Sequence, residues 1–291
     1  MKSKILGLAI SALFTMGAGA QTFMEWQDPA VNEINRLPMR ARFFPYASEQ
    51  EARVDNPLRS SRTLSLEGDW KFAATKDVKG YPTDFMKPGF DDSSWRTMPV
   101  PGLWEKNGVC DPMYLNVGYP WRGHFKNQPL AKEPVPYKDN IVGSYRREIV
   151  VPADWSGEEV TLYIGAVSSC AYVWVNGDFV GYTEDGRLEA EFDVTPFVKP
   201  GETNTIAFRV FRWCDGTYLE DQDMFRHTGF HRDVYLYARP KSHLADITIQ
   251  QDLINDYKDG LLALRLKSVG SPRYELSLTD ALGQKVWERS L

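Results

Sequence analysis

Short apolar runs separated by turn-forming residues dominate the chain between residues 62 and 240, and no long helical pattern lies between them. Many short strands at this spacing are typical of an antiparallel β-sandwich. The sequence therefore predicts an all-β domain over residues 62–240. Its candidate strands are residues 70–72, 145–151, 160–164, 171–175, 178–182, 205–211 and 233–238.

The strongest local signal is a hairpin around Asn176-Gly177, between apolar residues 171–175 and 178–182. A two-residue type I′ turn requires a positive φ at both central positions, and Asn followed by Gly meets that requirement best. The sequence therefore predicts two paired strands with a tight turn at this dipeptide.

Residues 21–61 show little of this strand pattern and are predicted to form an extended arm. Asp28 as N-cap and Pro29 at the first helical position predict one short helix over residues 30–37, which Pro38 ends. The rest of the arm is charged and irregular, so we expect it to lie along another surface without forming a core.

The strand pattern starts again after Pro240, at residues 247–249, 261–269, 274–278 and 286–287. An immunoglobulin-type sandwich needs about seven strands. Residues 241–291 are therefore predicted to be a truncated immunoglobulin-like domain, so that the chain ends inside its second sandwich.

The first 20 residues read as an export signal. Lys2 and Lys4 precede a mostly apolar run over residues 5–16, and Ala18-Gly19-Ala20 forms a small-residue cleavage site. The run is too short to span a bilayer, and no later segment approaches the length that a membrane helix needs. No cysteine follows the cleavage site to carry a lipid anchor, so we expect a periplasmic or secreted protein without a membrane partner.

Composition narrows the function further. A net charge of −5 provides no basic surface for nucleic acid, so a nucleic-acid partner is not expected. The three cysteines, Cys110, Cys170 and Cys214, match no zinc spacing and allow at most one disulfide. Buried thiols or a single bridge are both compatible with the sequence.

The most unusual stretch is residues 212–226, where an apolar strand leads into a bend at Asp215-Gly216. Four carboxylates follow within nine residues, at Asp215, Glu220, Asp221 and Asp223. Like charges at this density need cations, hydroxyl-rich ligands or water. A polar loop with aromatic residues at a strand end is a candidate ligand site.

These motifs, in this order, resemble the amino-terminal part of the β-galactosidases of glycoside hydrolase family 2. The motifs are long and cover nearly everything after the signal. They are Trp-Gln-Asp-Pro at 26–29, Ile-Asn-Arg-Leu at 34–37, Leu-Glu-Gly-Asp-Trp-Lys-Phe at 66–72, Val-Pro-Gly-Leu-Trp-Glu at 100–105, Tyr-Leu-Asn-Val-Gly-Tyr-Pro at 114–120, the hairpin at 174–182, residues 212–226, Gly229, and Arg-Asp-Val at 232–234.

The resemblance implies a jelly-roll sugar-binding domain followed by an immunoglobulin-like domain, with a catalytic TIM barrel next in the family. It implies hydrolysis of terminal β-galactosides with retention, by two glutamates at the ends of barrel strands. The chain holds no barrel pattern, and its one Asn-Glu dipeptide, Asn32-Glu33, lies in the arm. No catalytic residue is therefore expected in this chain, which is predicted to be inactive alone.

The resemblance also implies roles for individual residues. Asp215 matches a family aspartate that holds the galactosyl group and a monovalent cation, Na⁺ or K⁺; the alternative is a bend in which Asp215 caps backbone donors. Asn116 matches an asparagine that reaches the same sugar, or else simply forms a turn. Mg²⁺ is a further cofactor expected from the family.

The remaining charged residues of the loop are predicted to support it. Glu220, Asp221 and Asp223 do not fit an EF-hand loop, and are expected to pair with Arg212, Arg226 and Arg232. Three functions are open: the amino-terminal part of a β-galactosidase, a stand-alone periplasmic galactoside-binding module, or a subunit that complements a separate carboxyl-terminal polypeptide. A homo-oligomer is a further possible assembly.

Overall fold

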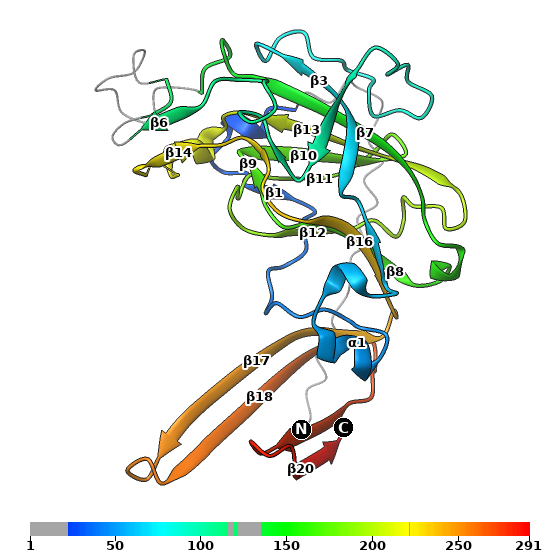
Figure 1. Ribbon diagram of the computed structural model, residues 1–291, viewed down its shortest axis with the longest axis vertical. Coiled ribbons are helices and arrows are strands. Elements are labelled where there is room, and N and C mark those ends of the chain that lie inside the picture. The colour runs from blue at the N-terminus through cyan, green and yellow to red at the C-terminus, as the bar shows by residue number, and fades with distance from the viewer. Residues whose placement is uncertain (1–22, 116–118, 122–134, 221) are drawn as a thin grey trace, which may run out of the picture.

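Two antiparallel sheets packed face to face form the main body of the protein (Figure 1). The computed structural model describes residues 23–115, 119–121, 135–220 and 222–291. The predicted fold class, an all-β jelly-roll sandwich followed by part of a second β-sandwich, is confirmed. The predicted export signal and the site residues Asn116 and Asp221 lie outside the described residues.

The larger sheet has seven strands in the order β1-β11-β10-β13-β7-β3-β4, and the smaller has four in the order β12-β8-β16-β2. The strands of the larger sheet are β1 (Glu33–Ile34), β3 (Gly68–Thr75), β4 (Arg96–Val100), β7 (Val142–Val150), β10 (Cys170–Val175), β11 (Asp178–Thr183) and β13 (Thr203–Phe211). The strands of the smaller sheet are β2 (Thr63–Ser65), β8 (Glu159–Ile164), β12 (Ala190–Asp193) and β16 (Val234–Arg239).

Short elements connect and cover these sheets. Two small sheets consist of β5 (Gly102–Leu103), β15 (Gly229–Phe230) and β9 (Val167–Ser168), and of β6 (Met113–Leu115) and β14 (Met224–Arg226). The helical segments are η1 (Glu25–Gln27), α1 (Glu49–Val54), η2 (Pro57–Arg59), η4 (Ala153–Trp155) and η5 (Asp215–Tyr218). No described helix is both long and apolar enough to cross a membrane.

The predicted hairpin is confirmed. Strands β10 and β11 are joined by Asn176 and Gly177, with φ values of 54° and 92°. The Asn176 amide also donates to the backbone carbonyl of Phe197 and to the side chain of Asn204, each at 2.8 Å. The turn is therefore fixed by its own backbone geometry and by two hydrogen bonds, one to a neighbouring loop and one to strand β13.

The predicted helix over residues 30–37 is wrong. Asp28 forms a turn instead, its side chain accepting from the Ala30 N–H at 3.1 Å, and the chain then extends into β1 beside β11. The segment is rich in β-branched and amide residues, which have low helix propensity, and an open sheet edge supplies better hydrogen-bond partners. The only α-helix of the described arm is α1 instead, capped by Ser48, which accepts from the Glu51 N–H at 3.2 Å.

The arm also contributes to a core, which the sequence did not predict. The main core lies between the two sheets, but a second cluster covers the outer face of the larger sheet. Trp26 of the arm is fully buried there, with its ring stacked 5.2 Å from the ring of Phe211. The arm therefore extends the larger sheet at its edge and covers one of its faces.

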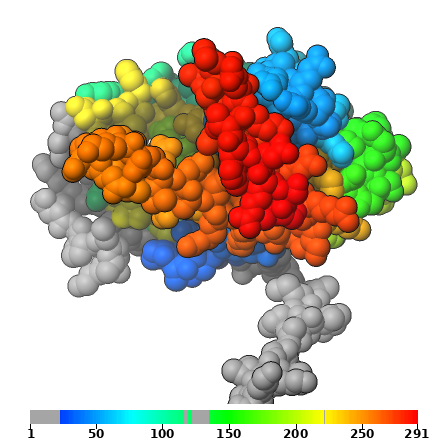
Figure 2. Space-filling model, turned by 90° about the horizontal axis from the view of Figure 1, so that it is seen from below, coloured from blue at the N-terminus to red at the C-terminus, as the bar shows by residue number. Residues whose placement is uncertain are grey.

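Residues 243–291 form two hairpins below the sandwich (Figures 1 and 2). They are β17 (His243–Ile254) with β18 (Asp259–Val269), and β19 (Glu275–Thr279) with β20 (Lys285–Ser290). All four overlap the strands predicted from the sequence. Apolar side chains along them, including Ile249, Leu262 and Trp287, are about half exposed and have no covering element in the described chain.

Candidate functional site

The acidic loop is held in place by buried polar contacts at the end of β13. Asn140 is fully buried, and its amide both donates to the carbonyl of Trp213 and accepts from the Trp213 N–H, each at 3.0 Å. The chain then enters η5, where the Cys214 N–H donates to the Thr217 hydroxyl at 3.1 Å. Asp215 is therefore presented at the first position of a short, firmly anchored helical turn.

Asp215 lies against Glu184, which follows strand β11. Their carboxyl groups share a hydrogen bond, and the Tyr182 hydroxyl donates to Glu184 at 2.8 Å. Burial and the charge of Asp215 raise the pKa of Glu184 to about 8, and burial also raises the pKa of Asp215. At neutral pH the two carboxyl groups therefore hold one proton between them, and Glu184 is the group that donates it.

One oxygen of Asp215 is left without a partner. Oδ1 is buried from solvent but forms no hydrogen bond with any described residue. A buried carboxylate oxygen in this state is costly unless a ligand donates to it or a cation binds it. The structure thus leaves Asp215 poised to accept a hydrogen bond or to ligate a cation.

The same place is the one group of potential metal ligands found in the described part of the chain. One ligand atom from each of Glu184, Cys214 and Asp215 lies within 4.8 Å of the others. Burial raises the pKa of the Cys214 thiol, so it stays protonated and is a poor ligand. The carboxyl oxygens remain, and they suit a hard monovalent cation such as Na⁺ or K⁺.

The arm closes this region from another side. Segment η1 contacts η5, and the negative charge of Asp28 acts on Asp215. The Asp28 motif and the Asp215 motif, far apart in the sequence, therefore meet at one end of the sandwich.

Of the predicted arginines, Arg226 lies beside the neighbouring carboxylates, and its charge acts on Glu220. The Asp223 carboxylate accepts a hydrogen bond from the Tyr114 hydroxyl, and Arg226 donates to the backbone carbonyls of Glu220 and Gln222. Strands β6 and β14 pair at Tyr114, so the segment that leads to Asn116 lies beside the acidic loop.

Glu220 is balanced by an arginine that the sequence did not single out. Burial raises the pKa of Glu220 to about 6, while the charges of Arg187 and Arg226 oppose this change. Arg187 also lies 3.4 Å from the ring nitrogen Nδ1 of His231. Arg187 and Arg226 thus stabilise the loop by charge and by backbone hydrogen bonds.

Arg212 and Arg232 do not reach these carboxylates in the described chain. The Arg212 guanidinium donates to the backbone carbonyl of Asp111 at 3.3 Å and lies over the ring of Trp213. Arg232 is exposed and forms no ion pair with a described residue. Its role in supporting the loop stays a prediction.

Sequence reasoning missed Glu184. The sequence did contain a signal for it, because Glu184 directly follows β11, and a carboxylate directly after a buried strand is unusual.

All three cysteines are free thiols. Cys170 and Cys214 are fully buried behind Asp215, where the two thiols hydrogen-bond to each other.

One cavity among the described residues does not include Asp215. It has a volume of about 540 Å³ and is lined by Lys76, Cys110, Asp139 and Arg212, among others. None of these lining residues belongs to the group of potential metal ligands. The candidate site in the Asp215 loop is therefore separate from this cavity.

Comparison with known proteins identifies the family to which this two-sheet sandwich belongs. Residues 63–240 match the family described as "Glycosyl hydrolases family 2, sugar binding domain". The chain belongs to this family, because the match covers more than half of it.

The relatives agree with this assignment. The chain is 36% identical to a β-galactosidase of Priestia megaterium over 286 residues, which cover 96% of this chain and 27% of that protein. It is 34% identical to a β-galactosidase large subunit of Lactobacillus acidophilus, over 93% of this chain and 44% of that protein. The chain thus spans between about a quarter and less than half of these relatives.

Solved structures show the same fold. The β-glucuronidase of Faecalibacterium prausnitzii superposes with a TM-score of 0.56 at 22% identity, over 78% of this chain and 39% of that one. A β-glucuronidase of Ruminococcus gnavus superposes with a TM-score of 0.57 at 19% identity, over 78% of this chain and 37% of that one. At these identities the likeness concerns the fold alone.

Proposed function

We propose that this chain provides the sugar-holding wall of a β-galactosidase active site, with Asp215 contacting the galactosyl group. The observation that carries the proposal is the buried Oδ1 of Asp215, which has no partner among the described residues. Relatives that match nearly the whole chain are named β-galactosidases. A family that hydrolyses galactosides with retention uses two glutamates, and in this proposal they lie on a barrel that these residues do not contain.

Within that site the chain's own residues bind and orient. Asp215 Oδ1 accepts a hydrogen bond from a sugar hydroxyl, while Glu184 holds the other side of the carboxylate in place. The proton of Glu184 keeps the pair from carrying two negative charges, so the sugar does not have to overcome their repulsion. Asn116, in the segment after β6, is proposed to reach the same sugar.

A monovalent cation, Na⁺ or K⁺, is the second proposed ligand of Asp215. When bound, it supplies a positive charge that orients sugar hydroxyls. Asp215 and Glu184 offer carboxyl oxygens, and the remaining ligands would come from the barrel, so binding to this chain alone should be weak. The Mg²⁺ expected from the family stays a prediction.

Titration calorimetry with D-galactose and lactose, in sodium and in choline buffers, tests this proposal. Asp215→Asn should abolish binding, whereas Asp178→Asn, a matched change in the exposed hairpin turn, should not. A chromogenic β-galactoside should not be hydrolysed by the chain alone. Turnover that Asp215→Asn removes would show that this chain is catalytic, and sugar binding unaffected by Asp215→Asn would remove Asp215 from the site.

A second candidate function is complementation of a separate polypeptide. The observation that favours it is the half-exposed apolar surface of the two C-terminal hairpins, which leaves Ile249, Leu262 and Trp287 open to a partner. Two relatives are named as large subunits. Co-expression with a barrel-containing polypeptide should give a complex that co-purifies and gains activity, and two chains that separate on gel filtration would count against it.

Export is proposed from the first 20 residues. Amino-terminal sequencing of the protein from a periplasmic fraction should start at Gln21. Full-length protein retained with the cytosolic fraction would contradict export.

A further inference from the structure

A second pocket lies between the arm and the outer face of the smaller sheet, and Asp215 is not among its lining residues. It has a volume of about 340 Å³, which is within the usual range for small-molecule sites. Its walls come from β8, β12, β16 and arm residues 40–57. None of these segments belongs to the loop that carries Asp215.

The floor of this pocket is aromatic and rigid. The rings of Tyr163 and Tyr235 stack with their centroids 4.5 Å apart and their planes 16° from parallel. Phe44 of the arm packs 5.6 Å from Tyr237 and 6.2 Å from Tyr235. These tyrosines alternate with core residues along their strands, so the sandwich itself fixes their positions. The floor therefore offers a preformed apolar surface.

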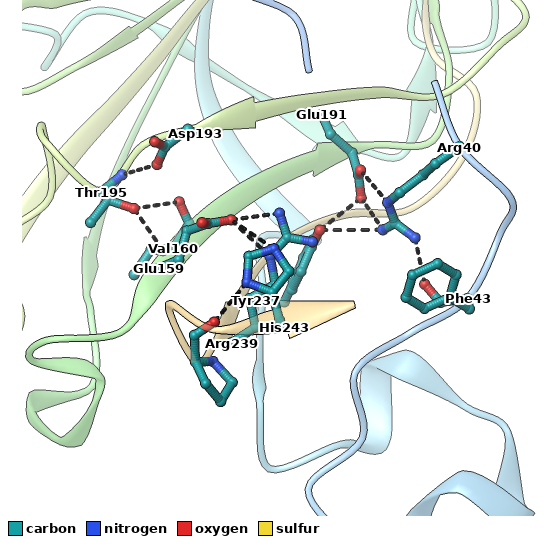
Figure 3. A network of polar contacts seen from close by, with 11 residues as sticks. Arg40, Phe43, Glu159, Val160, Glu191, Asp193, Thr195, Tyr237, Arg239 and His243 are labelled. Atoms are coloured by element: carbon teal, nitrogen blue, oxygen red, sulfur yellow. Dashed lines mark hydrogen bonds and ion pairs between the residues drawn. The ribbon is translucent and has the colours of Figure 1, made fainter. Parts of the chain in front are cut away.

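The arm is clamped over this floor by an ion pair (Figure 3). Arg40 donates to the two carboxylate oxygens of Glu191 at 3.0 and 2.8 Å, and to the carbonyl of Phe43 at 3.0 Å. The Tyr237 hydroxyl donates to the same carboxylate at 2.9 Å. Arg40 and Glu191 are thus satisfied by each other, and they shape the pocket without being available to a ligand.

Three other polar groups remain open at the pocket. Arg42 forms no hydrogen bond or ion pair with any residue in the described ranges, and the Tyr235 hydroxyl has no hydrogen-bond partner there either. Glu189 accepts from the Tyr163 hydroxyl at 2.9 Å through one oxygen, which leaves its other oxygen open. The pocket therefore presents a charged donor, a hydroxyl and a charged acceptor above an apolar floor.

This combination matches a hydroxylated ring. A pyranose has an apolar C–H face that packs on aromatic side chains, and its hydroxyls both donate and accept. The charges favour a neutral ligand over an anion, because Glu189 and Asp55 line the pocket together with Arg42. We propose that this pocket is a second carbohydrate site, which binds one neutral hexose ring through Phe44, Arg42, Glu189 and Tyr235.

Ligand-observed saturation-transfer NMR on the whole chain tests the proposal, with D-galactose and D-glucose as probes and D-glucuronate as the anionic comparison. Arg42→Ala and Tyr235→Phe each remove one open group, and each should weaken binding about tenfold, since that is the usual effect of one lost hydrogen bond to a ligand. Arg53→Ala is the matched control, because Arg53 is also an exposed arginine of the arm and does not line the pocket.

Asp215→Asn separates this site from the proposed active-site wall. Hexose binding that survives Asp215→Asn and Arg53→Ala but weakens in Arg42→Ala and Tyr235→Phe supports the pocket. Three results would overturn it: no saturation transfer to either hexose at tens of millimolar, binding lost in Asp215→Asn but kept in Arg42→Ala, or a response to glucuronate alone. If the Asp215 proposal fails, the comparison between Arg42→Ala and Arg53→Ala still tests the pocket.

Discussion

Replacing Glu184 by Gln should change how stability depends on pH. The folded protein holds a proton on Glu184 up to about pH 8, because burial and Asp215 raise its pKa from the usual value of 4.5. The unfolded chain releases this proton near pH 4.5. The folded state therefore binds more protons than the unfolded state between these two values, and stability must fall as the pH rises through this window.

The size of the effect follows from the two pKa values. Between pH 5 and 7.5 the linkage amounts to about 3 kcal/mol, an upper bound because Asp215 is partly exposed and solvent screens the pair. In the Glu184→Gln protein the new amide can still donate to Asp215 and accept from Tyr182, but it does not titrate. At pH 5 the two proteins should be similar, and at pH 7.5 the Glu184→Gln protein should be the more stable one.

Urea denaturation followed by tryptophan fluorescence at several pH values measures this difference. Choline chloride should replace sodium and potassium salts, so that no cation binds to the pair. Glu148→Gln, a change at an exposed position on β7, is the matched control and should follow the native protein. Parallel stability curves for the native and Glu184→Gln proteins would refute the shared-proton account.

Three further changes test other parts of the structure. Gly181→Ala should lower stability by about 1–3 kcal/mol, because the new methyl group would collide with the backbone carbonyl of Ile34 in β1. Proteases should then cleave the displaced arm faster. An unchanged urea midpoint would contradict this prediction. Arg40→Met should lower stability by about 3 kcal/mol, because it leaves Glu191 largely buried and without its cation. Adding Glu191→Met should restore most of this stability. A double variant as unstable as Arg40→Met would be evidence against the Arg40–Glu191 clamp. His231→Gln should reduce the loss of stability on acidification from pH 6.5 towards 4. Burial and Arg187 lower the pKa of His231 to about 4, so that in this window only the unfolded chain takes up the proton. Equal acid sensitivity of the native and His231→Gln proteins would exclude this account.

Local signals predicted the sandwich well because they are strong and short in range. Asn176-Gly177 specifies its turn by backbone conformation alone, and the main strands are short apolar runs bounded by turn-forming residues. The structure of the arm was harder to predict, because β1 is only two residues long and is stabilised by its pairing with β11. A capping signal did mark the real helix, at Ser48 and Glu51, but it has no apolar face to support it.

The position of the candidate site could be predicted from the sequence, but the contacts among its residues could not. Asp215 was found through its motif, because a family match preserves the order of residues. Its contact with Glu184 depends on how the ends of β11 and β13 come together, which no spacing along the chain encodes. The partners of the loop carboxylates were predicted from arginines nearby in the sequence, whereas Arg187, from the segment after β11, takes part of that role.

The placement of the arm affects where this domain can be cut. The family match begins at residue 63, yet the larger sheet begins at Glu33, and Trp26 packs into the cluster on its outer face. A recombinant domain designed on the family boundary would leave the edge of β11 unpaired and uncover an aromatic surface. Such a fragment should aggregate by edge-to-edge pairing, so the smallest expressible unit starts upstream of residue 26.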